Sequence, residues 1–258
     1  MFEQTWGTRV RVVVVGASSG LGRCIGVGLA QRGAQVALLA RRRERLADAC
    51  KEAGPGSVAI ECDVTDTASC ASAIAEAAGA LGGIDGLVYT PGIGPLARLV
   101  DTDRDQWREV FDTNVIGASV VTTAALPHLA AAAGTAVYLS SVSASQTPPW
   151  PGLGAYAVSK AALDKLVDAW RAEHTDVGFT RVIVGECAGG EGDAGTGFAD
   201  GWDLELAAEM VPLWMSRAYM TGTLMPVERL VTVVDMVLRA GAADAIPSVT
   251  VAPRGPTG

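Results

Sequence analysis

The stretch Val10-Arg11-Val12-Val13-Val14-Val15-Gly16-Ala17-Ser18-Ser19-Gly20-Leu21-Gly22 decides the fold of this chain. A run of valines that stops at a glycine predicts a buried strand followed by a tight turn. The spacing GxxxGxG then leads into a helical pattern, where free backbone N–H groups and the helix N-terminus can approach a pyrophosphate. We therefore expect a phosphate-binding loop made by Gly16, Ser18, Ser19, Gly20, Leu21 and Gly22.

Downstream of this loop, short apolar runs alternate with longer helical patterns. Strands that are apolar along their whole length and alternate with helices predict a parallel sheet covered on both faces, which is a doubly wound, Rossmann-like α/β fold of three layers. The expected strands are 10–15, 35–40, 58–61, 84–89, 136–140, 179–184 and 248–251. The expected helices are 20–32, 43–52, 67–81, 103–111, 115–132, 155–174 and 227–239. Because no linker or internal repeat divides the 258 residues, we expect a single domain over 1–258.

Composition narrows the class of partner. A formal net charge of −8 argues against a nucleic-acid or anionic-membrane surface, because both need clustered Lys and Arg. Residues 113–159 contain no charged side chain, but prolines and a glycine interrupt them, so they predict a buried helix and strand rather than a membrane span. No signal-peptide pattern precedes the first strand. The five cysteines lack metal-ligand spacing, which favours reduced thiols and a cytoplasmic protein.

A tyrosine and a lysine, Tyr156 and Lys160, stand four residues apart on the helix expected at 155–174. Residues at i and i+4 share one face of a helix, so the phenol and the ammonium would lie side by side. A nearby cation favours the phenolate, and we expect Lys160 to lower the pKa of Tyr156 from its usual value of about 10. Tyr156 would then serve as a general acid. The alternative is an ordinary pair on an amphipathic helix.

Taken in order, these motifs resemble the single-domain short-chain dehydrogenases/reductases. The resemblance covers residues 10–184 well and the remainder loosely, and it rests on the glycine loop, Asp63-Val64, Asn114, Ser140-Ser141 and the Tyr156/Lys160 pair. It implies that the glycine loop holds the cofactor pyrophosphate and that Asp63 contacts adenine, with Val64 and Gly92 nearby. It also implies that Asn114, Ser141, Tyr156 and Lys160 transfer protons.

Several assignments keep alternatives. Ser143 has the spacing to Tyr156 that is commoner in the family, whereas Ser141 has the position at the strand end, which we favour. Asp63 could instead cap a helix, as could Asp66, and Asn114 could merely satisfy buried backbone. Arg41 follows the second strand where a carboxylate would bind the ribose of NAD, so we expect a preference for NADP(H), with NAD(H) as the alternative.

The chain also departs from the family pattern. Thr90-Pro91-Gly92 stands where Asn-Ala-Gly is common, and Cys187-Ala188-Gly189 replaces a Pro-Gly turn, which leaves Thr196 as a substitute contact for the nicotinamide carboxamide. Residues 186–225 combine a glycine-rich run with Trp, Met and Leu. We interpret them as a mobile lid, the alternative being an irregular helical segment that simply packs on the body.

The predicted function is hydride transfer between NADP(H) and a neutral, mostly apolar ketone or secondary alcohol, without a metal. Two other functions remain open on the same residues: a catalytically silent NADP(H) sensor or scaffold, and an isomerase or dehydratase. The uncharged helix at 115–132 and the Tyr156 helix could pack against copies of themselves, which predicts a homodimer or homotetramer.

Overall fold

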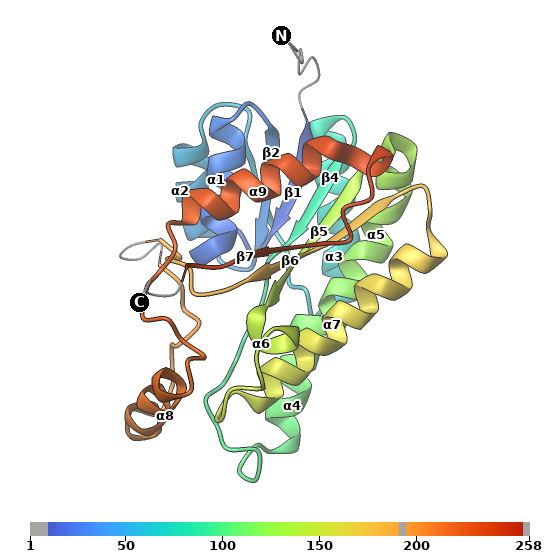
Figure 1. Ribbon diagram of the computed structural model, residues 1–258. Coiled ribbons are helices and arrows are strands. Elements are labelled where there is room, and N and C mark those ends of the chain that lie inside the picture. Colours follow the sequence, from blue (N-terminus) through green and yellow to red (C-terminus); the bar gives the residue numbers. More distant parts are fainter. Residues whose placement is uncertain (1–9, 191–194, 255–258) are drawn as a thin grey trace.

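A seven-stranded parallel sheet forms the centre of the protein (Figure 1). The computed structural model describes residues 10–190 and 195–254. The strand order is β3-β2-β1-β4-β5-β6-β7. The chain adds β2 and β3 on one side of β1 and the later strands on the other side, so the order of strands reverses between β1 and β4. Ligands of such sheets bind at this switch point. The strands are β1 (Arg11–Val15), β2 (Gln35–Ala40), β3 (Val58–Glu61), β4 (Gly86–Tyr89), β5 (Thr135–Ser141), β6 (Gly178–Val184) and β7 (Ser248–Val251).

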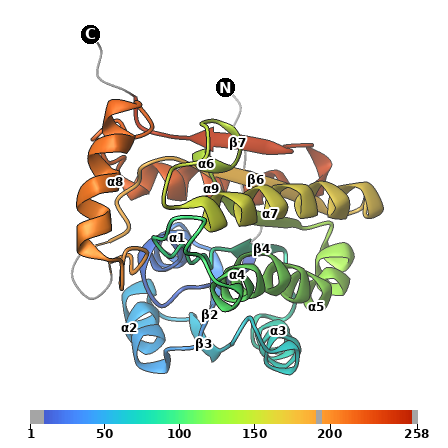
Figure 2. The ribbon, with the colours of Figure 1, turned by 90° about the horizontal axis from the view of Figure 1, so that it is seen from below.

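Helices cover both faces of the sheet, as Figure 2 shows. One face carries α1 (Gly20–Gln31), α2 (Arg43–Ala53) and α9 (Val227–Ala240), which ends in the short helix η3 (Gly241–Ala243); the other carries α3 (Thr67–Leu81), α5 (Gly117–Ala132) and α7 (Gly154–Glu173). The strands serve both layers because successive side chains point to opposite faces. Val12 and Val14 join the core under α1 and α9, whereas Val13 and Val15 join the core under α3 and α5. The predicted three-layer α/β fold is confirmed.

The helix break predicted between 111 and 115 is wrong. α4 (Arg104–Phe111), a π-helical turn η1 (Asp112–Ile116) and α5 form one continuous helix, Arg104–Ala132. A π turn adds one residue without breaking the backbone ladder, so it turns Asn114 into the protein interior, where it is 0% exposed. By length and composition this helix could cross a membrane. That is weak support for a span, since core helices pass the same test, and here its inner residues pack on α3 and the sheet.

The C-terminal third contains the segment predicted to be a lid. Its helix α8 (Leu204–Ser216) stands apart from the sheet and packs through Met210 and Trp214 on Leu96 and Leu153 of the body. Two indole N–H groups of the segment hydrogen-bond to the body of the protein. Trp202 Nε1 donates to Gly94 O at 2.9 Å, and Trp214 Nε1 donates to Pro151 O at 2.8 Å. These contacts support the packing alternative, and movement of the segment stays a prediction. Glu191 and Asp193 of this segment lie outside the described residues.

Candidate active site

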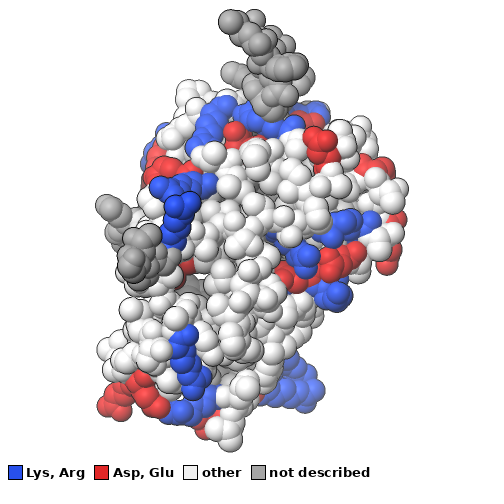
Figure 3. Space-filling model, viewed as in Figure 1, with Lys and Arg blue, Asp and Glu red and all other residues white. Residues whose placement is uncertain are grey.

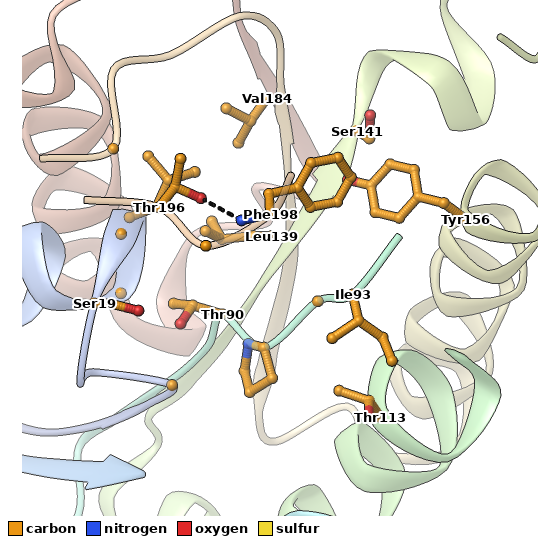
Figure 4. Close-up of a pocket in the computed structure, with 18 of the residues that line it drawn as sticks. Ser19, Thr90, Ile93, Thr113, Leu139, Ser141, Tyr156, Val184, Thr196 and Phe198 are labelled. Carbon is orange, nitrogen blue, oxygen red and sulfur yellow. Dashed lines mark hydrogen bonds between the residues drawn. The ribbon is translucent and has the colours of Figure 1, made fainter. Parts of the chain in front are cut away.

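A cavity of about 660 Å³ opens at the carboxyl ends of the strands, between the body and α8 (Figure 4). Residues from many separate stretches of the chain line it, which is why no single motif defines it. It brings together every predicted cofactor residue: Gly16, Ser18, Ser19, Gly20, Leu21, Gly22, Arg41, Asp63, Val64, Gly92, Tyr156 and Lys160. Ser141 and Ser143 line it as well, whereas Asn114 lies behind its wall.

The glycine loop has the conformation and the packing that only glycine allows. Gly16 has φ +84° and Gly20 has φ +58°, both in the left-handed region. A Cβ on Gly16 would lie 2.5 Å from Thr90 Oγ1, and one on Gly22 would overlap the same oxygen. Thr90 itself donates from Oγ1 to Val15 O at 2.6 Å. Thr90, the first residue of the stretch that departs from the family pattern, therefore supports the first turn of the glycine loop from the end of β4.

Arg42, which the sequence analysis did not select, contacts the glycine loop directly. Its guanidinium donates to Ser18 Oγ at 2.9 and 3.1 Å and to Ser19 Oγ at 2.6 Å. Burial, followed by the charges of Arg45 and Arg41, lowers the pKa of Arg42, yet an arginine stays charged at neutral pH. Arg41 also lines the cavity, and both arginines are exposed. The loop and the β2–α2 turn thus offer two cations to an anionic ligand.

Asp63 follows β3 and turns its carboxylate back on its own segment. Asp63 Oδ1 accepts hydrogen bonds from Thr65 N at 3.0 Å and Thr65 Oγ1 at 2.8 Å, and these bonds lower its pKa. The helix cap is made by Asp66, which accepts from Ala68 N and Ser69 N. Of the two capping alternatives, the one for Asp63 is therefore wrong, and Asp63 lies free of that role beside Val64 in the cavity wall.

Tyr156 and Lys160 lie on the same face of α7, as their spacing predicts. Lys160 Nζ is 5.9 Å from the centre of the Tyr156 ring and donates to Leu139 O at 2.8 Å. Gly92 leaves room for this ammonium, since a Cβ there would lie 3.2 Å from Nζ. The tyrosine, the lysine and the end of β5 are therefore held as one unit.

The expected direction of the tyrosine pKa is wrong for this arrangement. Burial raises the pKa of Tyr156 to about 12, and a hydrogen bond with Ser141 opposes the shift. Burial also lowers the pKa of Lys160 to about 8, against the field of Asp164. Desolvation disfavours both charged forms, and here it outweighs the attraction between them that the spacing suggested. A proton is consequently held firmly on the phenol and loosely on the amine.

Ser141 and Ser143 are partners rather than competitors. Their Oγ atoms are 2.9 Å apart, and Ser143 N donates to Ser141 Oγ at 3.2 Å as the short helix α6 (Val142–Ser145) begins. Ser141 is the one that reaches the Tyr156 hydroxyl. The serine at the end of β5 is therefore the one that meets the tyrosine, although it lies two residues further from Tyr156 than the commoner family spacing. The loop at 146–153 accommodates these two residues.

Asn114 forms hydrogen bonds with buried backbone groups, as the alternative interpretation of this residue predicts. Its side chain accepts from Ile93 N and donates to Ile93 O, both at 2.9 Å, and donates to Ser159 Oγ at 2.9 Å. Ser159 in turn donates to Tyr156 O at 2.7 Å. Asn114 thereby joins the π turn to the first turn of α7. A role for it in proton transfer stays a prediction.

The segment after β6 closes the far side of the cavity with an aromatic side chain. Phe198 lies edge-on against Tyr156, with ring centres 4.9 Å apart, and contacts Trp202 at 5.7 Å. Gly94 makes this approach feasible, since a Cβ there would lie 2.6 Å from Phe198 and 3.1 Å from Tyr156. Thr196 lies against Gly20 in the same cavity and accepts from Phe198 N (Figure 4). Nothing in the sequence pattern connects 198 with 156.

Glu186 directly precedes Cys187-Ala188-Gly189, the stretch that stands where the family has its Pro-Gly turn. It accepts hydrogen bonds from Thr221 N at 2.5 Å, Thr221 Oγ1 at 2.6 Å and Gly222 N at 3.2 Å. The carboxylate thus ties the end of β6 to the stretch before α9. Glu186 also lines the cavity, and these three donors fix the orientation of its carboxylate.

The sheet order and the glycine loop at its switch point are those of a Rossmann-like dinucleotide-binding protein, and the tyrosine–lysine pair lies in the same cavity as that loop. A family model described as short chain dehydrogenase matches residues 10–197, and the chain belongs to this family. Its members bind nicotinamide cofactors.

Among curated proteins, the chain is similar to 11-beta-hydroxysteroid dehydrogenase A of Sesamum indicum, with 33% identity over 180 residues, 67% of this chain and 51% of that protein. The chain spans about half the length of the first curated relatives it matches.

Two solved structures share the fold. An alcohol dehydrogenase from Thermococcus sibiricus, complexed with 5-hydroxy-NADP, has a TM-score of 0.78 at 21% identity and covers 95% of this chain and 96% of its own. A 3-ketoacyl-(acyl-carrier-protein) reductase from Brucella melitensis, complexed with NADH, has a TM-score of 0.78 at 18% identity, with the same coverage. Proteins with this fold therefore bind either nicotinamide cofactor.

Proposed function

We propose that this protein transfers hydride between NADP(H) and a neutral, mostly apolar ketone or secondary alcohol, with Tyr156 as the proton donor. The observation that carries the proposal is the meeting of Ser141, Tyr156 and Lys160 in the same cavity as the glycine loop. An ordinary amphipathic helix would have no reason to bury a lysine to 3% exposure beside a tyrosine and a phosphate-binding loop.

The residues present fit a nicotinamide dinucleotide. The glycine loop and the N-terminus of α1 would hold its pyrophosphate, and Asp63 with Val64 would meet the adenine. Arg42 and Arg41 favour a ligand with an additional phosphate, because β2 ends in Ala40 and offers no carboxylate there to a ribose hydroxyl. When bound, the cofactor supplies or accepts the hydride, which is the chemistry that the protein's own side chains lack.

The protein's part in the reaction is the movement of a proton. In the reductive direction Tyr156 donates its hydroxyl proton to the oxygen that gains charge, and Ser141 hydrogen-bonds the same oxygen. A pKa of about 12 keeps Tyr156 protonated at neutral pH. Lys160, held on Leu139 O, lies close enough to stabilise the phenolate as it forms. Ser143 fixes the Ser141 hydroxyl from behind.

An apolar substrate is favoured by the wall opposite the cofactor site. Six aromatic rings follow one another from Tyr156 through Phe198, Trp202, Trp214 and Trp150 to Tyr219, with successive centres 4.9, 5.7, 6.0, 5.3 and 6.4 Å apart. The indole N–H groups of all three tryptophans donate to the protein itself. This wall therefore presents ring faces rather than hydrogen-bond donors to a ligand. In Figure 3 the surface between the body and α8 is mostly neither acidic nor basic.

The test is turnover of a panel of ketones with NADPH and NADH, followed as loss of the reduced cofactor. The panel includes a steroid ketone, because a relative is named for hydroxysteroid oxidation, and a CoA thioester as the charged competitor. We expect turnover of apolar ketones with NADPH. Faster reaction of the thioester would contradict the neutral substrate, and tight NADPH binding without any turnover would favour the silent sensor. Conversion of a substrate without net loss of reduced cofactor would favour the isomerase or dehydratase.

We also propose that the protein is a homodimer or homotetramer of the cytoplasm. Ile116 on the π turn and Val158 on α7 are 51% and 46% exposed, so two neighbouring helices each leave a large apolar side chain uncovered. Light scattering of the purified protein measures the number of subunits, and a monomer at micromolar concentration would contradict this.

A further inference from the structure

A buried carboxylate lies directly behind the lysine of the proposed site. Asp164 follows Lys160 by one turn of α7 and shares its face, and the two residues are 6% and 3% exposed. The proposed reaction gives Asp164 no task, since it does not line the cavity. A buried ionised group is costly unless other charges or hydrogen bonds compensate it, so its position calls for a reason.

Groups from three elements surround this carboxylate. From β6, Arg181 brings Nη1 to 4.0 Å from Asp164 Oδ2 and Nη2 to 3.5 Å from Asp168 Oδ1. From β5, the Ser140 hydroxyl faces Asp164, next to the Leu139 carbonyl that holds Lys160. From α7 itself come Lys160 and Asp168, and Asp168 pairs with Arg171 at 3.0 Å. A line of alternating charges thus runs along α7 from Lys160 to the surface.

The polar atoms around Asp164 are not fully satisfied. Among the described residues, five buried side-chain polar atoms lack a hydrogen bond of ordinary geometry, and three of them are Ser140 Oγ, Asp164 Oδ1 and Arg181 Nε. Buried polar groups in folded proteins are nearly always paired, and those that are not gather where function demands them. Pure packing of α7 on the sheet would place apolar side chains here, as it does at Leu163 and Val167.

Asp164 interacts with two cations, Arg181 and Lys160. Burial raises the pKa of Asp164, and the Ser140 hydroxyl, Arg181 and Lys160 oppose that shift. Reciprocally, Asp164 is the group whose charge supports the protonated form of Lys160 against burial. Arg181 competes for the same carboxylate from the other side. Changing either Asp164 or Arg181 should therefore alter how firmly Lys160 holds its proton, in opposite directions.

We propose that Asp164 is a positioning residue that keeps Lys160 charged, and that the Asp164–Arg181 contact sets the pH above which the Tyr156–Lys160 pair loses its proton. This inference rests on the proposed function for its consequence in catalysis, but the coupling between Asp164 and Lys160 is a property of the folded chain and can be measured without any substrate.

The first experiment compares pH profiles of kcat/KM for ketone reduction in wild type, Asp164→Asn and Arg181→Gln. The alkaline limb reports loss of the proton shared by the pair. We expect Asp164→Asn to move this limb about one pH unit down, from one unit charge acting through a partly buried path, and Arg181→Gln to move it up by a similar amount. Glu173→Gln is the matched control: Glu173 is an exposed carboxylate on the same helix, and its limb should coincide with that of wild type.

The second experiment is a double-mutant cycle in urea unfolding with Asp164→Asn, Lys160→Met and the pair. We expect Lys160→Met to rescue part of the stability that Asp164→Asn loses, because the uncompensated ammonium is then gone. Additive losses, or alkaline limbs that coincide in all variants, would overturn the inference and leave Asp164 a purely structural residue. If Asp164→Asn does not fold alone, recovery of folding in the double variant supports the coupling and its absence refutes it. Lack of turnover in wild type would instead contradict the proposed function, while the unfolding cycle would still decide the coupling.

Discussion

Replacing Arg42 with glutamine should reduce the affinity for NADPH far more than the affinity for NADH. The guanidinium makes three short contacts, at 2.6, 2.9 and 3.1 Å, with the hydroxyls of Ser18 and Ser19. It therefore reaches the rim of the glycine loop, where an additional phosphate on the adenine-side ribose would be met. Glutamine keeps a hydrogen-bond donor, but it is shorter than arginine and carries no charge.

The size of the effect follows from the number of charged contacts at stake. A hydrogen bond to a charged group contributes about 1.5–3 kcal/mol, and glutamine preserves at most the neutral part of it. A net loss of about 1.5–2.5 kcal/mol corresponds to a rise of roughly 10- to 70-fold in the Kd for NADPH. The Kd for NADH should change less than about threefold, because NADH lacks the phosphate that the guanidinium would bind.

The measurement is titration of the intrinsic fluorescence of the protein with each cofactor, in wild type, Arg42→Gln and Arg41→Gln. The Arg41 variant tests the residue that the sequence favoured, whose side chain makes no contact with the glycine loop among the described hydrogen bonds. An equal loss of affinity for NADPH and NADH in Arg42→Gln would refute the reasoning, since it would mean that Arg42 only maintains the conformation of the glycine loop. A loss of NADPH affinity confined to Arg41→Gln would refute it as well.

Three further predictions test the site. Tyr156→Phe should lower kcat by a factor of about 10²–10⁴ and leave the Kd for NADPH nearly unchanged, and turnover within a few-fold of wild type would remove the assigned acid. Lys160→Met should be more stable than wild type at pH 7 by about 1–3 kcal/mol in urea unfolding. The pKa of Lys160 falls from 10.5 to about 8 on folding, so burying the charged amine destabilises the wild type below pH 8. This destabilisation should disappear as the pH rises towards 10.5. A gain that persists at pH 10.5 would show that burial of the charge is not its cause. Gly94→Ala should lower kcat/KM about 10-fold or more, because its Cβ would displace Phe198 from Tyr156, and an unchanged value would show that Phe198 is not part of the working site.

The elements of the fold could be predicted wherever the sequence period was regular. The last strand, Ser248–Val251, falls on the predicted residues. The break predicted after Phe111 was wrong, because a helical pattern read at 3.6 residues per turn cannot show that a π turn inserts one residue and lets the helix continue through Asn114.

The candidate site was predictable in membership but not in detail. The order of the motifs brought the glycine loop, Asp63, Ser141, Tyr156 and Lys160 to one cavity because parallel strands all end at the same edge of the sheet. The contact between Arg42 and the glycine loop could not be predicted, since the β2–α2 turn decides which guanidinium faces the loop, and the role given to Arg41 stays a prediction. Phe198 and Glu186 could not be predicted, because their partners lie far away in the chain.

The sequence by itself determined the order of strands and helices, the phosphate-binding turn and the shared face of Tyr156 and Lys160, because each depends on residues a few positions apart. Only the tertiary structure decided how strongly each of these groups holds a proton, since that depends on how much water the folded chain removes. Burial raises the pKa of the phenol and lowers that of the amine, against the trend that their closeness alone predicts. The same packing places Asp164 one turn behind the lysine, where its carboxylate opposes the effect of burial on that charge, and places Arg181 beside Asp164.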